Sequence, residues 1–245
     1  MKNTVNIQEA NPNFTNRRNF LKISGFGAVS AGLLMAVGCS DDDDETNPVD
    51  DKLPGVRNGV FDIGGGDFGV LTYAYALEQL EADFYTKVVA NFSSYSEEAK
   101  DIFSDLHKHE VIHREFFKAA LTDALPDPSK QLLPSLAFSY GSLNFANQAA
   151  VTDVAITLED TGVAAYNGAG KLITNSAYLV IAGQIVSVEA RHAAAVRDLK
   201  APGTNAFANT TDANGLDPAK DPSAIISAVK TLGLITTPFS ATFLP

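Results

Sequence analysis

The sequence of 245 residues is long enough for one or two domains, and its hydrophobic content of 45% is ample for a packed core. This content excludes an intrinsically disordered chain. The formal net charge of -11 argues against a nucleic-acid partner, because phosphate binding requires a basic surface. The single cysteine excludes an intramolecular disulfide and a cysteine-based metal site.

Residues 1–38 are predicted to be an export signal and are left out of the fold prediction. The run Asn16-Arg17-Arg18-Asn19-Phe20-Leu21-Lys22 resembles the twin-arginine signal. The apolar run from Ile23 to Val37 is shorter than the roughly 20 residues that a membrane span requires. It ends in Ala36-Val37-Gly38-Cys39, which resembles a lipoprotein processing site and predicts that Cys39 carries lipid. The alternative is an ordinary cleaved signal in which Cys39 is incidental.

Residues 39–66 are predicted to be a tether between the membrane and the folded domain. The adjacent carboxylates of Asp41 to Glu45 repel one another, so this run should be solvated and extended. It is a simple spacer, or it resembles the acidic signals that send some lipoproteins to the outer face of the outer membrane. The predicted location is therefore the cell envelope, in the periplasm or at the outer-membrane surface, with membrane contact through the lipid alone.

Four helical segments are predicted between residues 67 and 200, because apolar residues recur at spacings of three and four. They cover roughly residues 68–91, 96–123, 148–173 and 177–199. Asp67 is expected to cap the first, since its side chain can accept hydrogen bonds from the first helical turn. Short turns join the first segment to the second and the third to the fourth. The long link over residues 124–147 then gives an all-α four-helix bundle with one crossover.

Residues 201–245 form the last predicted part of the chain. They are polar and loop-like at first, and a short helix follows from Asp221-Pro222 to about Leu232. We expect this extension to pack on the outside of the bundle without chemistry of its own.

Two Glu-x-x-His motifs lie in the second and fourth helical segments, at Glu110–His113 and Glu189–His192. Residues three apart on a helix share one face, so each pair can reach one metal ion. Glu78 and Glu159 precede the two motifs at nearly equal distances, and a tyrosine follows each of them by the same interval. This repeat predicts a bundle with pseudo-twofold symmetry.

Four carboxylates on mostly apolar helix faces would be costly to bury without a counter-charge, and two divalent cations would neutralise them. We therefore predict a site for two metal ions, in which Glu78 and Glu159 bridge or cap the pair. The predicted ligands are Glu78, Glu110, His113, Glu159, Glu189 and His192.

Three further residues are candidates for a supporting role. Glu81 lies three residues after Glu78 and would be an extra ligand or a neighbour of the ligands, although Gly162 occupies the matching place in the third segment. Tyr85 and Tyr166 either donate hydrogen bonds to a site carboxylate or are core aromatic residues with partners elsewhere.

A different interpretation applies to His109-Glu110-Val111-Ile112-His113, which also fits the zinc-protease motif His-Glu-x-x-His. His109 and His113 would then bind zinc, and Glu110 would act as the general base. This alternative needs a third ligand further along the chain and leaves the repeat unexplained. Outside it, His109 is expected to be a surface residue.

The run from Gly66 to Tyr85, Gly-Asp-Phe-Gly-Val-Leu-Thr-Tyr-Ala-Tyr-Ala-Leu-Glu-Gln-Leu-Glu-Ala-Asp-Phe-Tyr, resembles the first helix of a secreted ferritin-like domain family that includes desiccation-related proteins. The ligand set resembles the rubrerythrin type within the ferritin-like superfamily, and the resemblance covers about residues 66–200. It implies two iron ions that react with oxygen or peroxide, in a ferroxidase, peroxide-scavenging or oxidase reaction. Manganese or a mixed centre fits the same oxygen and nitrogen ligands. The alternative is a non-catalytic, stress-related binding protein whose metal only stabilises the bundle.

Overall fold

A computed structural model describes residues 52–245. The predicted export signal, the lipid site at Cys39 and the acidic run lie outside the described residues, and they stay predictions.

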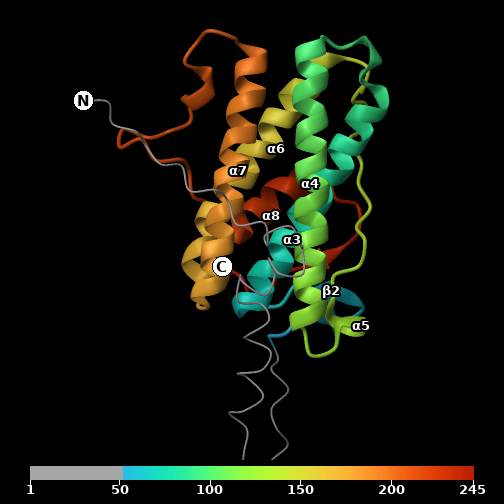
Figure 1. Cartoon of the computed structure of the whole chain (residues 1–245). Coiled ribbons are helices and arrows are strands. Elements are labelled where there is room, and N and C mark those ends of the chain that lie inside the picture. The colour runs from blue at the N-terminus through green and yellow to red at the C-terminus, as the bar shows by residue number, and fades with distance from the viewer. Residues whose placement is uncertain (1–51) are drawn as a thin grey trace, which may run out of the picture. The chain divides into compact units, whose positions relative to one another are not determined.

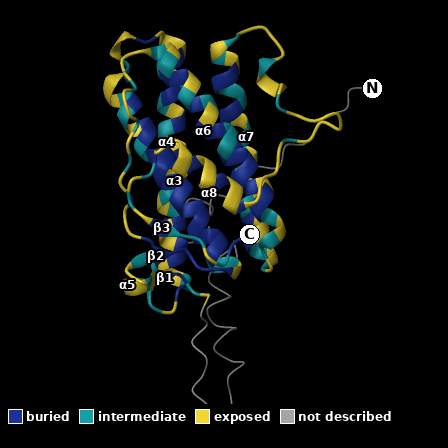
Figure 2. Cartoon of the chain, turned by 180° about the vertical axis from the view of Figure 1, so that it is seen from behind, coloured by how far each residue is buried: buried dark blue, intermediate teal, exposed yellow. Residues whose placement is uncertain are grey.

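Four long helices form the bundle, as Figure 1 shows, and the predicted all-α four-helix architecture is confirmed. They are α3 (Gly66–Asn91), α4 (Glu97–Ala124), α6 (Gln148–Ala169) and α7 (Ser176–Lys200). Polar side chains cap the last three, because Ser96, Asn147 and Asn175 each accept a hydrogen bond from an amide of the first turn. Figure 2 shows the buried residues along the inner faces of these helices.

The link between α4 and α6 is the predicted crossover, and it runs along the bundle (Figure 1). It contains one short helix that the sequence did not predict, α5 (Pro128–Gln131). Two side chains of α3 hold the link in place: the amide of Leu136 donates to Gln79 Oε1 at 2.9 Å, and the Tyr140 hydroxyl donates to Asp83 Oδ2 at 3.0 Å.

The prediction that Asp67 caps the first helix is wrong. The N-cap is Gly65, which has no side chain to accept a hydrogen bond. The carboxylate of Asp67 instead accepts from the amides of Thr174 and Asn175, at 2.7 and 2.9 Å, and from the Thr174 hydroxyl at 3.0 Å. Asp67 therefore ties the start of α3 to the turn before α7, a contact that local sequence cannot reveal.

The predicted tether ends too late, because residues from Gly55 to Asp62 belong to the folded unit. They form an antiparallel hairpin of β1 (Gly55–Arg57) and β2 (Val60–Asp62), with Asn58 and Gly59 at positive φ in its turn. β2 also pairs in parallel with β3 (Phe239–Ser240) near the C-terminus. The first described residues are therefore held by the last ones.

Asp62 joins these two ends of the chain. Its carboxylate is fully buried and accepts hydrogen bonds from the Gly64 amide, the Ser240 hydroxyl, and both the amide and the hydroxyl of Thr242. Asp62→Asn is expected to lower the free energy of unfolding by about 1 kcal/mol, because the NH2 group that replaces one carboxylate oxygen would face hydrogen-bond donors and cannot accept from them. Urea denaturation tests this, with the exposed Asp101→Asn as the control that should leave stability unchanged.

The C-terminal residues pack against the bundle as expected. α8 (Pro222–Thr231) lies against α6, and its buried residues include Ile225 and Val229. α6 ends at Ala169, earlier than predicted, and a single 3-10 turn (Gly170–Leu172) follows it. Just before α8, the Lys220 amide donates to the carbonyl of Ala164 on α6 at 3.0 Å, which fixes this segment to the helix.

Among the described helices, α7 is long and apolar enough to cross a membrane by length and composition. Its buried residues, however, include Ile181, Ile185, Glu189 and His192. Since this face includes ionisable side chains that meet residues of the other bundle helices, α7 is a helix of the bundle core.

Candidate metal centre

The structure brings all six predicted ligands together in the middle of the bundle. Each of the four long helices contributes one of the glutamates, and all four glutamates are fully buried. His192 is buried, and His113 is 12% exposed at its side chain. The helical repeat of each Glu-x-x-His motif turns its glutamate and histidine to the same side.

Their ligand atoms form two overlapping groups, in each of which the atoms lie within 4.8 Å of one another. One group is made by Glu78, Glu110, His113 and Glu189, and the other by Glu110, Glu159, Glu189 and His192. Glu110 and Glu189 belong to both groups, so they are the residues placed to bridge two ions. Glu78 and Glu159 were predicted to bridge or cap the pair of ions, but each of them belongs to one group only.

The contacts inside each group are close. His113 Nδ1 lies 3.0 Å from Glu189 Oε1 and 3.3 Å from Glu110 Oε2. His192 Nδ1 lies 2.8 Å from Glu110 Oε1 and 3.5 Å from Glu159 Oε2. Each histidine thus turns the same ring nitrogen, Nδ1, toward the carboxylates.

Two tyrosines hold the glutamates that belong to one group only. The Tyr85 hydroxyl donates to Glu159 Oε1 at 2.5 Å, and the Tyr166 hydroxyl donates to Glu78 Oε1. Both contacts are buried, and each connects one helical pair to the other. Of the two alternatives for Tyr85 and Tyr166, the structure therefore favours hydrogen bonds to site carboxylates. It does not favour core aromatic residues whose hydroxyl groups have partners elsewhere. Each tyrosine orients a carboxylate and leaves its second oxygen facing the centre.

The remaining donor atoms fit a pair of cations. Within residues 52–245, Oε2 of Glu78 and Glu159, both carboxylate oxygens of Glu110 and Glu189, and Nδ1 of both histidines are buried without a hydrogen-bond partner of good geometry. Buried polar atoms normally have a partner, so a converging set of such atoms fits a cation bound among them. Carboxylate oxygens with one imidazole nitrogen in each group suit iron, manganese or zinc.

The protonation of the centre also points to a cation. Burial, followed by the charge of Glu189, raises the pKa of Glu110 well above its usual range, and burial raises the pKa of Glu159 to about 7. Burial acts in the same direction on Glu189, but its contacts with His113 and His192 prevail and lower its pKa to about 2. Without metal, protons thus supply the positive charge that these buried carboxylates need.

Glu81 is buried beside this centre but belongs to neither group. A Cβ atom at Gly162 would lie 3.1 Å from Glu81 Oε1 and 3.6 Å from Glu189 Oε2, so the glycine leaves room for both carboxylates. Burial and then the charge of Glu189 raise the pKa of Glu81 well above its usual range, and a neutral carboxyl group is favoured there. Its other side borders a cavity of about 20 Å³ against α8. Glu81 is placed as a neighbour of the ligands.

His109 is the residue whose place sequence reasoning missed. It is exposed, as expected, but its Nδ1 lies 2.8 Å from Nε2 of His192. His113 faces the carboxylates instead, so the structure does not place the two histidines of the His-Glu-x-x-His motif around one ion. Glu110, the base of the zinc-protease alternative, is part of both ligand groups. That alternative is therefore wrong for the described chain.

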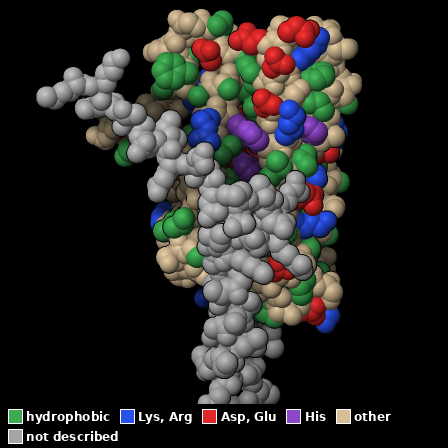
Figure 3. Space-filling view, in the orientation of Figure 1, with side chains coloured by type: hydrophobic (Ala, Val, Ile, Leu, Met, Phe, Trp, Pro, Cys, Tyr) green, Lys and Arg blue, Asp and Glu red, His purple; other side chains and the backbone are tan. Residues whose placement is uncertain are grey.

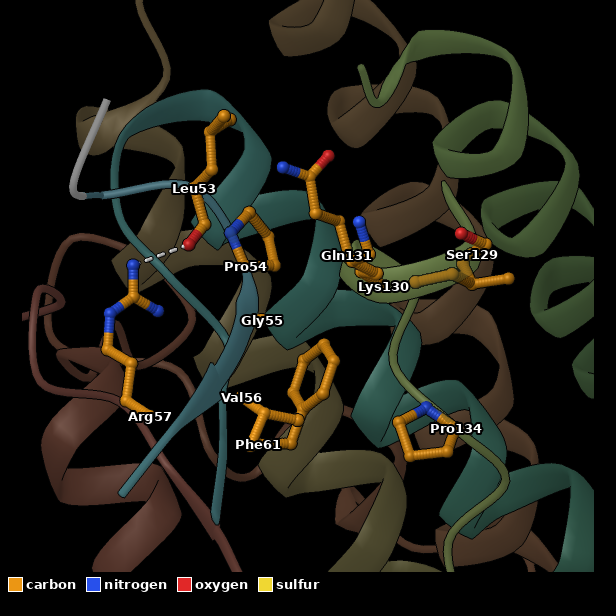
Figure 4. A pocket seen from close by; sticks show the side chains of 11 residues that line it. Leu53, Pro54, Gly55, Val56, Arg57, Phe61, Ser129, Lys130, Gln131 and Pro134 are labelled. Atoms are coloured by element: carbon orange, nitrogen blue, oxygen red, sulfur yellow. Dashed lines mark hydrogen bonds between the residues drawn. The ribbon is translucent and has the colours of Figure 1, made fainter. Parts of the chain in front are cut away.

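Histidine side chains reach the surface on the face shown in Figure 3. The side chain of His113 is partly exposed, so the centre lies close to solvent. A larger open groove of about 630 Å³ lies elsewhere, between the β1–β2 hairpin and the α5 region (Figure 4). Val56 and Phe61 line one part of it, and Gln131 and Pro134 line another. None of the six predicted ligands borders this groove.

The family model of the ferritin-like domain matches residues 66–202, more than half of the chain. The chain therefore belongs to the ferritin-like domain family. Among solved structures, it is similar to a candidate ferritin-like diiron-carboxylate protein from Thermotoga maritima, with 24% identity and a TM-score of 0.42. That match covers 56% of this chain and 95% of the other, and at this level of likeness it carries no functional argument. No curated protein sequence matches the chain.

Proposed function

We propose that this chain is a diiron-carboxylate protein that uses ferrous iron to reduce oxygen or peroxide. The observation that carries the proposal is the pair of overlapping four-residue groups that share Glu110 and Glu189. Two bound iron ions would supply the electrons for the oxidant and hold it in place. The outcome would be a ferroxidase, peroxide-scavenging or oxidase reaction.

The residues of the centre would have different roles in holding the two ions. Glu110 and Glu189 would hold both ions, while Glu78 with His113 and Glu159 with His192 would each complete the surroundings of one. Tyr85 and Tyr166 keep Glu159 and Glu78 in position through buried hydrogen bonds. Fixed orientation of the carboxylates lowers the reorganisation needed when an ion binds.

Purified protein should contain two iron ions per chain and consume oxygen when ferrous iron is added to the metal-free form. Metal analysis, an oxygen electrode and an anomalous signal in a crystal measure these outcomes. Bound metal without oxygen or peroxide consumption would instead favour the alternative, a non-catalytic ferritin-like protein with a structural metal. If metal analysis finds manganese at both positions, the proposed centre is a dimanganese centre with the same ligands.

Metal binding is expected to release protons and to become stronger as the pH rises. Burial disfavours the charged form of His192, but contacts with Glu110, Glu159 and Glu189 prevail and raise its pKa to about 12. Its Nδ1 proton must therefore leave before that atom can bind a cation. The apparent affinity should rise about tenfold per pH unit for each proton released.

Calorimetric titration in buffers of different ionisation enthalpy, between about pH 6 and pH 8, counts the released protons. Affinity that does not change with pH would contradict protonated ligands in the metal-free centre.

We also propose that the protein is exported by the twin-arginine route and anchored to the cell envelope through lipid on Cys39. The support is the sequence around Arg17-Arg18 and before Cys39, together with the resemblance of Gly66 to Tyr85 to a secreted, desiccation-related subgroup. Labelled fatty acid should be incorporated into the wild-type protein and not into Cys39→Ser. Equal labelling of both would refute the anchor.

A further inference from the structure

We infer that His109 is a positioning residue for His192, and that it makes the two metal positions of the proposed centre unequal. The inference rests on the proposed function, since it concerns one ligand of that centre. His109 Nδ1 and His192 Nε2 lie 2.8 Å apart, a hydrogen-bond distance for two ring nitrogens.

The two imidazoles lie edge to edge. Their planes differ by 15° and their centroids are 5.1 Å apart. Rings stacked face to face could not bring two nitrogens to 2.8 Å, which is closer than the van der Waals separation of stacked atoms. A nearly coplanar pair with this separation has the in-plane geometry of an N–H···N hydrogen bond, because the lone pair of an imidazole nitrogen lies in the plane of the ring.

The direction of this hydrogen bond follows from the other side of His192. Its Nδ1 faces Glu110 and Glu159 and would bind the metal ion through its lone pair. The proton of the neutral ring is then on Nε2, which donates to Nδ1 of His109. In most metal sites a carboxylate, a backbone carbonyl or a water accepts this bond, and the acceptor fixes the tautomer and the ring orientation. Here a second histidine, from the helix opposite, takes that place.

Within residues 52–245, no side chain gives His113 the corresponding hydrogen bond. His113 corresponds to His192 in the repeat, and the residue that corresponds to His109 is Val188. A valine side chain cannot accept a hydrogen bond. The ion in the group with His192 should therefore be held more tightly than the ion in the group with His113.

The test is cobalt(II) binding to the metal-free protein, followed by visible absorption. His109→Phe keeps a ring at this position and removes the hydrogen-bond acceptor. It should lower the affinity for one of the two cobalt(II) ions by about 10- to 100-fold and leave the affinity for the other unchanged. His109→Gln keeps an acceptor and should restore most of the lost affinity. His107→Phe, on the same helix and in contact with Thr86, is the matched control and should bind like the wild type.

A second measurement does not depend on metal. In protein labelled with nitrogen-15 histidine, the hydrogen-bonded Nε2 proton of His192 should be visible by NMR in the wild type and lost in His109→Phe. Unchanged cobalt(II) binding in His109→Phe, or equal weakening of both ions, would overturn the inference. If the wild type binds no pair of ions, the proposed function fails. The NMR signal of the metal-free protein then tests the His109–His192 hydrogen bond by itself. If the wild type does not show this signal, the inference is overturned as well.

Discussion

Replacing Glu189 with glutamine is expected to abolish the binding of both metal ions, with a loss of affinity of at least about 100-fold for each. The carboxylate of Glu189 is in both ligand groups, and it lies 3.0 Å from Nδ1 of His113 and 3.8 Å from Nδ1 of His192. An amide has the same shape, but it has no negative charge and offers one acceptor oxygen in place of two.

The informative comparison is with Glu78→Gln, because Glu78 belongs to one group only. This variant should lose one ion and keep the other, as measured by metal analysis and cobalt(II) titration. Glu98→Gln, an exposed carboxylate in the first turn of α4, is the control and should keep both ions. Equal losses in Glu189→Gln and Glu78→Gln would contradict the bridging role of Glu189.

Replacing Gly168 with alanine is expected to lower the free energy of unfolding by about 3 kcal/mol. A Cβ atom at this position would lie 1.8 Å from the carbonyl oxygen of Lys220 and 2.4 Å from its carbonyl carbon. The obstacle is backbone and cannot rotate away. Either α6 or the segment before α8 must move, and the hydrogen bond from the Lys220 amide to Ala164 would be lost.

The matched control is Gly183→Ala on the exposed side of α7, where a Cβ atom would meet nothing within 4 Å. It should stabilise the protein by about 0.5–1 kcal/mol, because alanine favours the helix over glycine. Urea denaturation of both variants measures the two effects. If Gly168→Ala were as stable as the wild type, the close packing of residue 220 on α6 would be wrong.

Much of the centre could be predicted because its ligands follow helical spacing. Glu110 with His113 and Glu189 with His192 lie three residues apart, and this spacing alone turns them to one side of each helix. The repeat then placed Glu78 and Glu159 opposite them. Which glutamates are shared could not be predicted, since sharing depends on the depth and rotation of each helix in the bundle.

Contacts between distant segments explain the remaining differences. Asp67 has the side chain of a good helix cap, but the turn at Thr174 competes for it across more than a hundred residues of sequence. Residues 55–62 were predicted to belong to the tether, but they form strands because β1 and β2 pair with each other and β2 pairs with β3 from near the C-terminus. His109 looked like a surface residue because nothing in its own helix reveals that His192 lies opposite.

The crossed tyrosine contacts bear on how such a chain could arise. Tyr85 reaches a glutamate of the second helical pair, and Tyr166 reaches a glutamate of the first. Two copies of a single ancestral helical hairpin could make the same reciprocal contacts as a homodimer. The tyrosine of each copy would donate to a glutamate of the other, and the metal ligands would be divided between the two subunits. Gene duplication followed by fusion would join those copies through the long crossover. In a fused chain the two halves could differ, as they do where histidine stands at position 109 and valine at position 188.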